Sequence, residues 1–593
     1  MYKNLTTICY SPSDLTRYMG SPFASWMDRF VIEQPDQAPD KDPDDALMGM
    51  LAQKGYAHED AMEATLTEQG LSLVKIDSGS KEEKREQTIS AMNDGIDIIV
   101  QARLELDQFG GFADFLVKVS GQSQLGDYHY EVWDTKLANK IKPTFIIQLC
   151  CYAEMLEAIQ GCRPEIITVA LGNGEKVRLR TSDFYYYYQS LKSAFLLDQN
   201  NFDPDIRPDP ADSKSWADWS DFAEQLLTEQ DHLFQVANIT RGQIKKLNHA
   251  GITTMQQLAD SALSHVSGIN PAVLEKLKSQ ASIQKESNGY EVPHFEILLP
   301  APGEKSGLTL LPPHSSLDVF FDIEGYPLDE GGLEYLWGCT YFNSEGVRDF
   351  KDYWAHNREQ EKTAFEAFIR WVYERWQKDL SMHIYHYANY EIAACRKLMG
   401  RYGVCEHEVD QLLRNEVFVD LYKVVKGGLL LGEPRYSIKN VEHIYRGKRD
   451  TEVASGGESV VVYDQWRELN QRGEQGATWN TSSILEEIRK YNIDDCDSTQ
   501  ELAEWLREQQ KSHGISFLGK TEVIEPEIKE EITERTQLRD RLLQRSLTEL
   551  KSDTAQAVLT ENLAWVLEFH RREAKPMFWR LFERLGLSHI ELM

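Results

Sequence analysis

Two strand-forming segments that flank a polar turn constrain this chain most. Residues 112–119 and 130–137 are rich in β-formers and aromatic residues, and the stretch between them has turn chemistry, so they are predicted to be neighbouring strands. Asp114 lies on the first strand, and Asp134 and Lys136 lie two residues apart on the second. Residues two apart on a strand face the same side, so the three charged side chains are predicted to share one surface of a sheet.

Two carboxylates on one surface repel each other unless a cation neutralises them, and Mg²⁺ prefers carboxylate oxygens and water as ligands. Asp114 and Asp134 are therefore predicted to bind a divalent metal. The ammonium of Lys136 beside that metal could activate a water molecule or stabilise a pentavalent phosphate. Lys140 and Lys142 extend a local basic island. The competing interpretation is a strand pair with solvated charges.

Residues before and after these strands complete a recognisable order. His58 and Glu59 lie upstream in a helical run, and Gln148 and Tyr152 are four residues apart on one face of a predicted helix. This order resembles the RecB-type nucleases of the PD-(D/E)xK superfamily. Those nucleases carry an early helical histidine, a G-x-x-D strand, a D-x-K strand and a Q-x-x-x-Y helix. The resemblance implies a restriction-endonuclease-like fold, with His58 as a further metal ligand and with Gln148 and Tyr152 positioning DNA.

A second set of acidic residues occupies the C-terminal half of the chain. Asp322 and Glu324 lie two apart on a strand of β-formers, SLDVFFDIEGYP. Glu391 stands at a turn between a strand and a helix. The predicted helix IRKYNIDDCDSTQELAEWL then carries Tyr491 and Asp495.

This order resembles the DEDD exonuclease group of the ribonuclease H-like fold. The resemblance implies that four carboxylates hold two cations about 4 Å apart and that Tyr491 orients the attacking water. Glu391 stands where the group normally has aspartate, and its longer side chain shifts the carboxylate. Asp420 has two interpretations, one structural and one in support of the site. Asp494 and Asp497 are interpreted as solvated or capping acids.

The segment between the two acidic sets is predicted to be helical. Gly251 and Gly268 each precede an isoleucine between helical segments, which resembles tandem helix-hairpin-helix elements. Such glycine turns present backbone N–H groups to phosphates. Arg241, Lys245 and Lys246 add positive charge and are predicted to bind DNA. A helical spacer without DNA-binding activity explains the pattern equally well.

The predicted fold class is a multidomain α/β protein. Its predicted divisions are a RecB-type PD-(D/E)xK domain at 1–202, a helix-hairpin-helix module at 203–285, a linker at 286–315, a ribonuclease H-like DEDD exonuclease domain at 316–512 and a helical region at 513–593.

Composition limits the function classes. A length of 593 residues predicts three or four domains. The 64 basic and 95 acidic residues give a net charge of −31, which argues against a general polyanion binder but leaves room for a nuclease that needs acids for metal. The chain contains no apolar run of membrane-spanning length, its eight cysteines are scattered, and no signal peptide is expected from its first residues. A cytoplasmic protein with reduced thiols is expected.

The whole order resembles the bacterial RecB-like nuclease family, whose larger members continue into a superfamily 1 helicase. The resemblance implies an exonuclease that hydrolyses DNA with Mg²⁺ or Mn²⁺ at single-stranded ends, in DNA repair, recombination or defence. It also implies a helicase partner in the same or a neighbouring chain, because the final helix carries Trp579 and Phe582 on an amphipathic face. A DNA-binding adaptor with degenerate sites and an RNA-processing exonuclease remain as alternatives.

Relatives of this family often hold an iron–sulfur cluster through one early cysteine and a later C-x-x-C-x-x-x-x-C run. The corresponding positions here are Ser21, Asp212, Ser215 and Ser220. Hydroxyls and a carboxylate are poor ligands for such a cluster, so no cluster is expected. Packing of Trp26, Trp216 and Trp219 is predicted to join the two ends of the domain instead.

Overall fold

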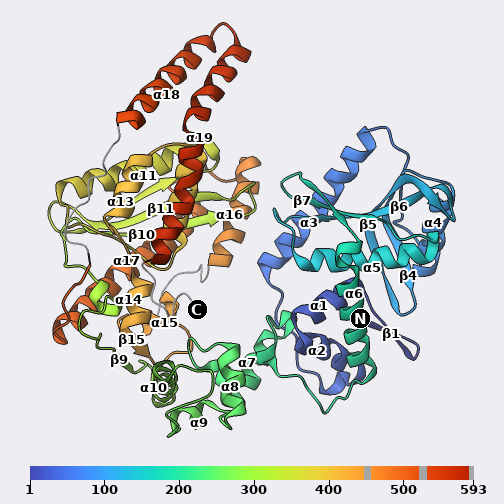
Figure 1. Ribbon diagram of the computed structural model, residues 1–593, viewed down its shortest axis with the longest axis horizontal. Helices are drawn as coiled ribbons and strands as arrows, with labels where there is room; N and C mark the ends of the chain where they lie inside the picture. Colours follow the sequence, from blue (N-terminus) through green and yellow to red (C-terminus); the bar gives the residue numbers. More distant parts are fainter. Residues whose placement is uncertain (447–455, 520–529, 586–593) are drawn as a thin grey trace.

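The computed structural model describes residues 1–446, 456–519 and 530–585. It contains two mixed α/β units, each built on its own sheet, with a small helical module between them in the chain and a helical hairpin near the C-terminal end (Figure 1). The predicted α/β class is therefore confirmed. None of the described helices has the length and apolar character needed to cross a bilayer.

The N-terminal unit is built on a six-stranded sheet with the order β3-β4-β5-β6-β7-β8. The β5 strand is antiparallel to its neighbours β4 and β6, the pairs β3–β4 and β6–β7 are parallel, and β8 returns antiparallel to β7. The predicted strand pair corresponds to β5 and β6, which extend further into the polar turn than their composition indicated. The strands are β3 (Leu73–Lys75), β4 (Ile98–Leu106), β5 (Phe109–Ser123), β6 (Gly126–Lys136), β7 (Ile166–Leu171) and β8 (Lys176–Arg180).

Helices cover both faces of this sheet. The middle of α5 is apolar on all sides and buries Leu149 and Ala153, because it lies between the sheet and the helices α1 and α6. On the opposite face, α3 packs Met62 and Leu66 against Phe115. The helices of this unit are α1 (Pro12–Gly20), α2 (Pro22–Glu33), α3 (Ala46–Glu68), α4 (Lys81–Asn93), α5 (Pro143–Gln160) and α6 (Ser182–Asn200).

The helical module has a core of its own, in which Leu247, Leu258 and Leu274 are fully buried. Gly251 and Gly268 have φ angles of +85° and +80°, a region that L-residues other than glycine rarely adopt. The two predicted glycine turns between helices are therefore present. The helices of the module are α8 (Arg241–His249), α9 (Met255–Ala259) and α10 (Pro271–Ser287), and α7 (Ser220–Glu229) precedes them.

The first part of this segment packs on the N-terminal unit and differs from the predicted division. Trp219 and Ala223 are buried against Phe23 and Met27 of α2, and Trp219 Nε1 donates to Asp28 Oδ1 at 3.1 Å. The proline- and aspartate-rich break predicted a boundary, but the tryptophan after it finds its apolar partners on an early helix. The module with its own core accordingly begins after α7.

The second unit is built on a five-stranded sheet with the order β12-β11-β10-β13-β14. The first three strands are antiparallel neighbours, whereas β10, β13 and β14 run parallel, so β10 is the central strand. The strands are β10 (Val319–Tyr326), β11 (Leu333–Phe342), β12 (Arg348–Trp354), β13 (Ile384–His386) and β14 (Phe418–Asp420).

Helices on the two sides of this sheet have different roles. The α11 helix packs Phe365 and Phe368 beside Phe321 in the main core, together with α12 and α13. The long α17 crosses β10, β11 and β13, and α16 packs beside it. The sequence pattern did not predict α16. The helices are α11 (Arg358–Lys378), α12 (Tyr390–Tyr402), α13 (Glu406–Arg414), α14 (Leu421–Gly428), α15 (Ile438–Val441), α16 (Gly456–Gln471) and α17 (Ser483–Ser512).

The segment predicted as a linker at 286–315 belongs to the second unit. Its strand β9 (Phe295–Ile297) pairs antiparallel with β15 (Leu429–Leu431), and Leu308 and Leu311 are fully buried beside α14 and α17. Proline and glycine in this segment indicated a linker, but its scattered leucines complete a core that is distant in sequence.

The C-terminal helices α18 (Glu530–Glu549) and α19 (Thr554–Leu585) pack against each other as a hairpin. Figure 1 shows the hairpin projecting from the second unit, with α19 running back along that unit. Lys575 Nζ lies 2.5 Å from Glu406 Oε1 of α13, and Arg572 donates to the Gly403 carbonyl at 3.2 Å. A partner surface was predicted on Trp579 and Phe582. The structure describes the backbone of α19 at these positions but not the two side chains.

The α3 helix contacts both units. Its second half covers the N-terminal sheet, and its first half packs Leu47 and Met50 into an apolar cluster with Tyr463 and Trp466 of α16. Figure 1 shows α3 running between the two units.

Candidate functional site

Three acidic side chains of the second unit converge on its central strand. Asp322 and Glu324 lie two residues apart on β10, and Asp495 reaches them from α17. Their carboxylate oxygens lie within 4.8 Å of one another. Among residues 1–446, 456–519 and 530–585, no other group of three or more His, Cys, Asp or Glu side chains reaches that spacing. The structure thus brings three of the predicted metal ligands together.

A buried asparagine holds the first acid. Asn492, one helical turn before Asp495, is fully buried and donates through Nδ2 to Asp322 Oδ2 at 2.7 Å. Its Oδ1 lies against Gly338, the register partner of Asp322, where an added Cβ would be 1.6 Å from that oxygen. A glycine at this position on β11 therefore makes room for the carboxamide.

A buried serine on α16 holds the second acid. Ser459 Oγ donates to Glu324 Oε2 at 2.5 Å, and the Tyr335 hydroxyl lies 2.8 Å from the same serine oxygen. All three residues are buried. Because the Ser459 hydroxyl donates its proton to Glu324, the Tyr335 hydroxyl is the donor in its hydrogen bond with Ser459.

The acids of this site are electrostatically strained without a cation. Burial raises the pKa of Asp322 well above its usual range, and the charges of Asp495, Glu324 and Glu391 raise it further. Burial also raises the pKa of Glu324 to about 8, although the hydrogen bond from Ser459 opposes the rise. Buried, mutually repelling carboxylates are a donor set that divalent cations prefer. The residues present therefore fit a metal site.

Glu391 lies beside this triad and is buried in the first turn of α12. His386 is fully buried with its Nδ1 3.3 Å from Glu391 Oε2. Burial alone would lower the pKa of His386, but the hydrogen bond to Glu391 and its charge raise the pKa overall. The charge of Glu391 also raises the pKa of Asp322, so the fourth predicted acid faces the site without joining the triad.

Asp420 has the structural role that was one of its two interpretations. Its Oδ1 accepts from the N–H of Tyr422 at 3.0 Å, which caps α14, and from the N–H of Ala388 at 2.9 Å. Ala388 has a φ of +72° in the turn that leads to Glu391. Asp420 therefore stabilises that turn and acts on the site through it.

The remaining predicted residues of the helical motif divide into two groups. Tyr491 is buried on α17, one turn before Asp495. Asp494 pairs with Arg446, and Asp497 lies 3.2 Å from Arg348. These two acids are therefore engaged by arginines outside the triad.

In a comparison with known protein families, residues 319–507 match a model of the RNase H superfamily. The matched range contains the whole five-stranded sheet and all four predicted acids. The second unit is an RNase H-like domain. A search of curated proteins found no match to the chain. The RNase H-like domain indicates a nuclease that acts on nucleic acid, and nucleases of this type use divalent metals.

Apart from the RNase H-like domain, acids also gather in the N-terminal unit, where its two long strands separate. The last register pair between β5 and β6 is Phe115 with Trp133. Beyond that pair, Asp114 Oδ2 accepts from the Thr135 N–H at 2.8 Å and from the Thr135 hydroxyl at 3.0 Å, while β6 continues against β7. The side chain of Asp114 thus takes the place of the next backbone pairing.

The alternation of β4 slips by one residue at the same level of the sheet. Val100 lies in the core under α3, whereas Ala102 lies in the opposite core. Between them Gln101 has a φ of +53°, which is strained for a residue with a side chain. Gln101 Nε2 donates to Glu59 Oε2 at 3.0 Å and directs this α3 residue toward the acids.

The ammonium of Lys136 interacts electrostatically with three carboxyl groups of this unit. Lys136 Nζ lies 2.7 Å from Asp134 Oδ2. Burial and the charge of Asp114 raise the pKa of Asp134 to about 8, against the effect of Lys136. Burial and Asp114 also raise the pKa of Glu59 to about 7. Burial disfavours the charged form of Lys136, but the charges of Asp134, Asp114 and Glu59 raise its pKa overall.

The other predicted residues of this set lie on α3 and α5. His58 directly precedes Glu59, and its Nε2 is buried without a hydrogen-bond partner among the described residues. Tyr152 is buried, and its hydroxyl donates to the Phe112 carbonyl of β5 at 2.7 Å. Gln148 lies one turn earlier on α5. Unlike the triad of the RNase H-like domain, this set does not bring three ligand atoms within 4.8 Å of one another in the described part of the chain.

The three basic residues predicted to grip DNA each contact another part of the chain. These contacts are Arg241 with the Ser213 carbonyl, Lys245 with Asp212 at 3.4 Å, and Lys246 with the Gly268 carbonyl at 2.7 Å. Two of the three contacts are made to backbone oxygen, and only that of Lys246 lies at a glycine turn.

The predicted tryptophan packing is present. Trp219 is fully buried, and Trp26 and Trp216 are partly buried in the same cluster. Ser21, at the position of the early cysteine of relatives, caps α2 by accepting from the Ala24 N–H at 3.0 Å. This packing joins α2 to the segment that follows α6.

Sequence reasoning missed Gln101, Ser459 and Asn492. The role of Asn492 was predictable from the sequence, because it directly follows Tyr491 in the helical motif and a helix presents it one turn from Asp495. Gln101 and Ser459 carry no local signal, since each acts through a partner that is distant in sequence.

Proposed function

We propose that this chain is a metal-dependent nuclease that hydrolyses phosphodiester bonds in DNA at two separate sites. The observation that carries the proposal is the triad of Asp322, Glu324 and Asp495, whose oxygens lie within 4.8 Å of one another inside the range that matches the RNase H superfamily. A fold used by nucleases and a donor set suited to divalent cations support the same chemistry.

In the RNase H-like domain, Asp322, Glu324, Glu391 and Asp495 would hold Mg²⁺ or Mn²⁺. When bound, the cations would supply charge that neutralises the phosphate and polarises the attacking water. Asn492 and Ser459 keep two of the acids in place by hydrogen bonds. We assign Tyr491 to orientation of the attacking water, because it lies one turn from Asp495.

In the N-terminal unit we propose a RecB-type PD-(D/E)xK site with Asp114, Asp134 and His58 as metal ligands. The separation of β5 and β6 at Asp114 supports this reading, because the carboxylate of Asp114, rather than a backbone pair, meets β6 at Thr135, next to Asp134. Lys136 is positioned by Asp134 to place its ammonium where negative charge develops on phosphate. Gln148 and Tyr152 would position the DNA strand. Tyr152 also holds β5 through its hydrogen bond to the Phe112 carbonyl.

The proposed substrate is DNA with single-stranded ends, cleaved as an exonuclease in DNA repair, recombination or defence. Arg241, Lys245 and Lys246 on α8, the helix before the first glycine turn, would contact its phosphates. If they do, their joint neutralisation should weaken DNA binding and flatten its dependence on salt. A superfamily 1 helicase is the proposed partner, and the apolar residues exposed along α19 are where it would bind.

The decisive experiment incubates the protein with end-labelled single-stranded DNA and RNA in Mn²⁺, in Mg²⁺ and in EDTA. We expect cleavage of DNA in either metal and none in EDTA, and its loss in a variant that combines Asp134→Ala with Asp322→Ala. Preferred cleavage of RNA would move the RNase H-like domain to RNA processing. Tight binding without cleavage in any metal would leave a DNA-binding adaptor.

A further inference from the structure

The edge strand of the N-terminal sheet carries three cations on one face. Lys176, Arg178 and Arg180 alternate along β8 with two apolar residues, which pack toward the core that contains α5. The three cations therefore lie on the opposite face, where Lys176 Nζ stands 4.9 Å from the centroid of the Trp133 ring. We call these three residues the β8 cations. In the described part of the chain, β8 is the last strand of its sheet, so one side of it is open.

The charges of the β8 cations are only partly neutralised. Arg178 Nη2 lies 3.5 Å from Oε2 of the buried Glu131, and the side chain of Arg178 remains 61% exposed. Lys176 and Arg180 are exposed, and neither forms an ion pair with the described residues. The chain as a whole has a net charge of −31, so this strand is a local reversal of charge.

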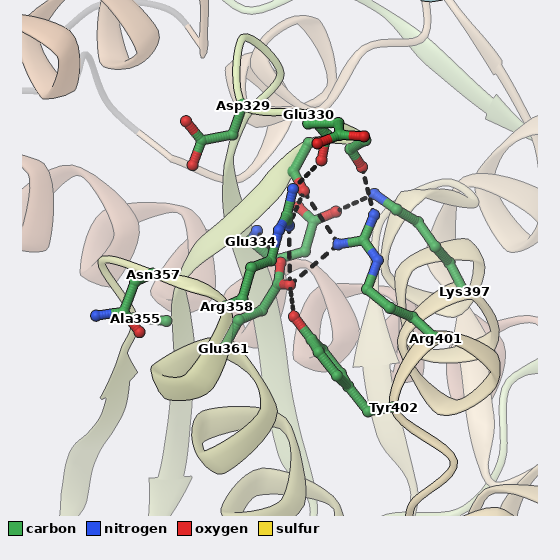
Figure 2. Close-up of polar contacts among 12 residues, drawn as sticks. Asp329, Glu330, Glu334, Ala355, Asn357, Arg358, Glu361, Lys397, Arg401 and Tyr402 are labelled. Atoms are coloured by element: carbon green, nitrogen blue, oxygen red, sulfur yellow. Dashed lines mark hydrogen bonds and ion pairs between the residues drawn. The ribbon is translucent and has the colours of Figure 1, made fainter. Parts of the chain in front are cut away.

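Figure 2 shows how differently cations are engaged in a charged cluster of the RNase H-like domain. Lys397 Nζ lies 3.1 Å from Glu334 Oε1, and the fully buried Glu361 accepts from Arg358 at 3.2 Å and from Arg401 at 3.1 Å. Both guanidinium groups also donate to carbonyl oxygens of the loop between β10 and β11. Those cations hold the fold together, whereas the charges of the β8 cations remain available to a ligand.

Two neutral hydrogen-bond donors lie beside the middle cation. Thr168 is the register partner of both Trp133 and Arg178, so the three side chains form one row across β6, β7 and β8. Trp133 Nε1 and Thr168 Oγ1 are buried and have no hydrogen-bond partner among the described residues. An indole N–H and a hydroxyl can both donate to oxygen. This row therefore suits an anion that carries several oxygen atoms.

The β8 cations begin close to the acids of the same unit. Lys176 is the register partner of Ala170, which is the partner of Thr135, the residue that binds Asp114. Two strand spacings separate Lys176 from Thr135, a distance of about 10 Å across the sheet. The other two cations follow along β8 at intervals of about 7 Å, the rise of two residues in a strand. An extended nucleic-acid strand likewise carries one negative charge per nucleotide along a line.

We propose that the β8 cations bind backbone phosphates of a nucleic acid a few nucleotides away from the bond held at the N-terminal acids, and thus form a track that leads to that site. The inference rests on the proposed nuclease function and adds a binding surface to it. Single-stranded and duplex nucleic acid share this backbone, and the test separates them. An acidic protein segment has the same sign of charge but no reason to lead toward a phosphodiester-cleaving site.

The test uses the full-length chain carrying Asp322→Ala, so that the RNase H-like site does not contribute. Lys176→Gln combined with Arg180→Gln removes two charges and retains Arg178, whose loss would leave Glu131 buried without its cation. The probes are a DNA oligonucleotide long enough to span the acids and β8, its duplex, and polyglutamate of equal charge. Dissociation constants are measured in EDTA over a range of salt concentrations, and KM and kcat for the DNA probes are measured in Mn²⁺.

We expect this double variant to weaken DNA binding about 2- to 30-fold, as two exposed phosphate contacts are lost. The slope of the logarithm of affinity against the logarithm of salt concentration should become shallower by about 1.4 for the single strand or about 1.8 for the duplex. The form of DNA that shows this change is the form that follows the track. KM should rise by a similar factor with kcat unchanged, because the cations lie away from the reacting bond, and polyglutamate binding should not change.

Lys81→Gln combined with Arg85→Gln is the matched control, because both are exposed cations on α4, which packs on β4 toward the other edge of the sheet. Equal losses in the two double variants, an equal loss for polyglutamate, or no loss at all would overturn the proposal. Weaker DNA binding with an unchanged KM would mean that the β8 cations serve another site, and the track would be wrong. If the parent and the variant bind as expected but the parent cleaves nothing in Mn²⁺, the binding surface stands and the nuclease function fails.

Discussion

Lys54 Nζ lies 2.9 Å from Asp464 Oδ1 and joins α3 of the N-terminal unit to α16 of the RNase H-like domain. Asp464 is buried and also accepts the hydroxyl of Tyr326. Lys54 lies five residues before Glu59 on α3, and Asp464 lies five residues after Ser459 on α16. At about 1.5 Å of rise per residue, each of these helical spans is about 7.5 Å long. A short path of packed helix therefore connects the two groups of acids.

Removal of the lysine in Lys54→Met should destabilise this contact. Asp464 would remain buried with the Tyr326 hydroxyl as its donor. We expect the free energy of unfolding to fall by about 1 to 3 kcal/mol, because one partner of a buried pair is lost. Chemical denaturation and limited proteolysis measure the effect. Arg472→Met, directly after the end of α16, is the control, because Arg472 forms an exposed pair with Glu468 at 3.8 Å and should change stability by less than about 0.5 kcal/mol. Equal effects of the two substitutions would contradict the prediction.

The two sites should be chemically separable although their units touch. Asp134→Ala is expected to remove one nuclease activity and Asp322→Ala another, because the two aspartates lie on strands of different sheets, each with its own neighbouring acids. Cleavage of labelled DNA by each single variant and by the double variant measures this. Loss of all cleavage in either single variant, with circular dichroism unchanged, would mean that the sites depend on each other.

Lys136→Ala should lower turnover much more than metal affinity. The ammonium of Lys136 is not a metal ligand, and in this structure it serves as the cation beside Asp134 at 2.7 Å. We expect a loss in kcat of about 100-fold, typical for one electrostatic group, and a smaller change in Mn²⁺ affinity by calorimetry. A similar loss in both quantities would assign Lys136 to the integrity of the metal site instead.

The metal-free protein should lose stability as the pH rises toward 8. The pKa values of Asp134 and Glu324 are raised to about 8 by burial and by neighbouring acids. A carboxyl with a higher pKa in the folded than in the unfolded chain favours folding while it is protonated. That contribution is present at about pH 4 and is lost as the pH passes through the raised pKa.

Divalent metal should reverse this trend, because it binds the ionised carboxylates of the folded state. We expect Mn²⁺ to raise Tm more at about pH 9 than at about pH 6, measured by differential scanning fluorimetry against EDTA. Combining Asp134→Asn with Glu324→Gln should flatten the pH dependence and reduce the metal effect. A metal-induced shift that is equal at both pH values would argue against cation binding at these acids.

Asn492→Ala should weaken metal binding at the RNase H-like site. Asp322 would lose the hydrogen bond that fixes its carboxylate, and the half-saturating Mn²⁺ concentration is expected to rise about 10-fold or more. Gly338→Ala should have a similar effect, because its Cβ would meet the carboxamide of Asn492. Gly400→Ala, where an added Cβ meets nothing within 4 Å, is the control. An unchanged Mn²⁺ requirement in Asn492→Ala would remove its positioning role.

Local pattern was sufficient for the elements that carry the acids. The alternation in β10 and the helical spacing of Tyr491 and Asp495 predicted where these side chains point, because a strand repeats every two residues and a helix every 3.6. Composition was less reliable at boundaries. The proline- and glycine-bearing segment that contains Leu308 was predicted as a linker, but it packs in the core beside α14 and α17.

The sequence by itself determined which acids are available, the strands and helices that bear them, and the glycine turns at Gly251 and Gly268. The tertiary structure decided which partners hold those acids. Ser459 approaches Glu324 from a helix whose own sequence shows no motif, and Gln101 directs Glu59 through a strained turn of β4. Such contacts depend on the packing of segments that are distant in the chain, and local periodicity contains no information about that distance. The acidic residues are therefore readable from sequence, whereas their spacing and protonation follow from burial in the folded protein.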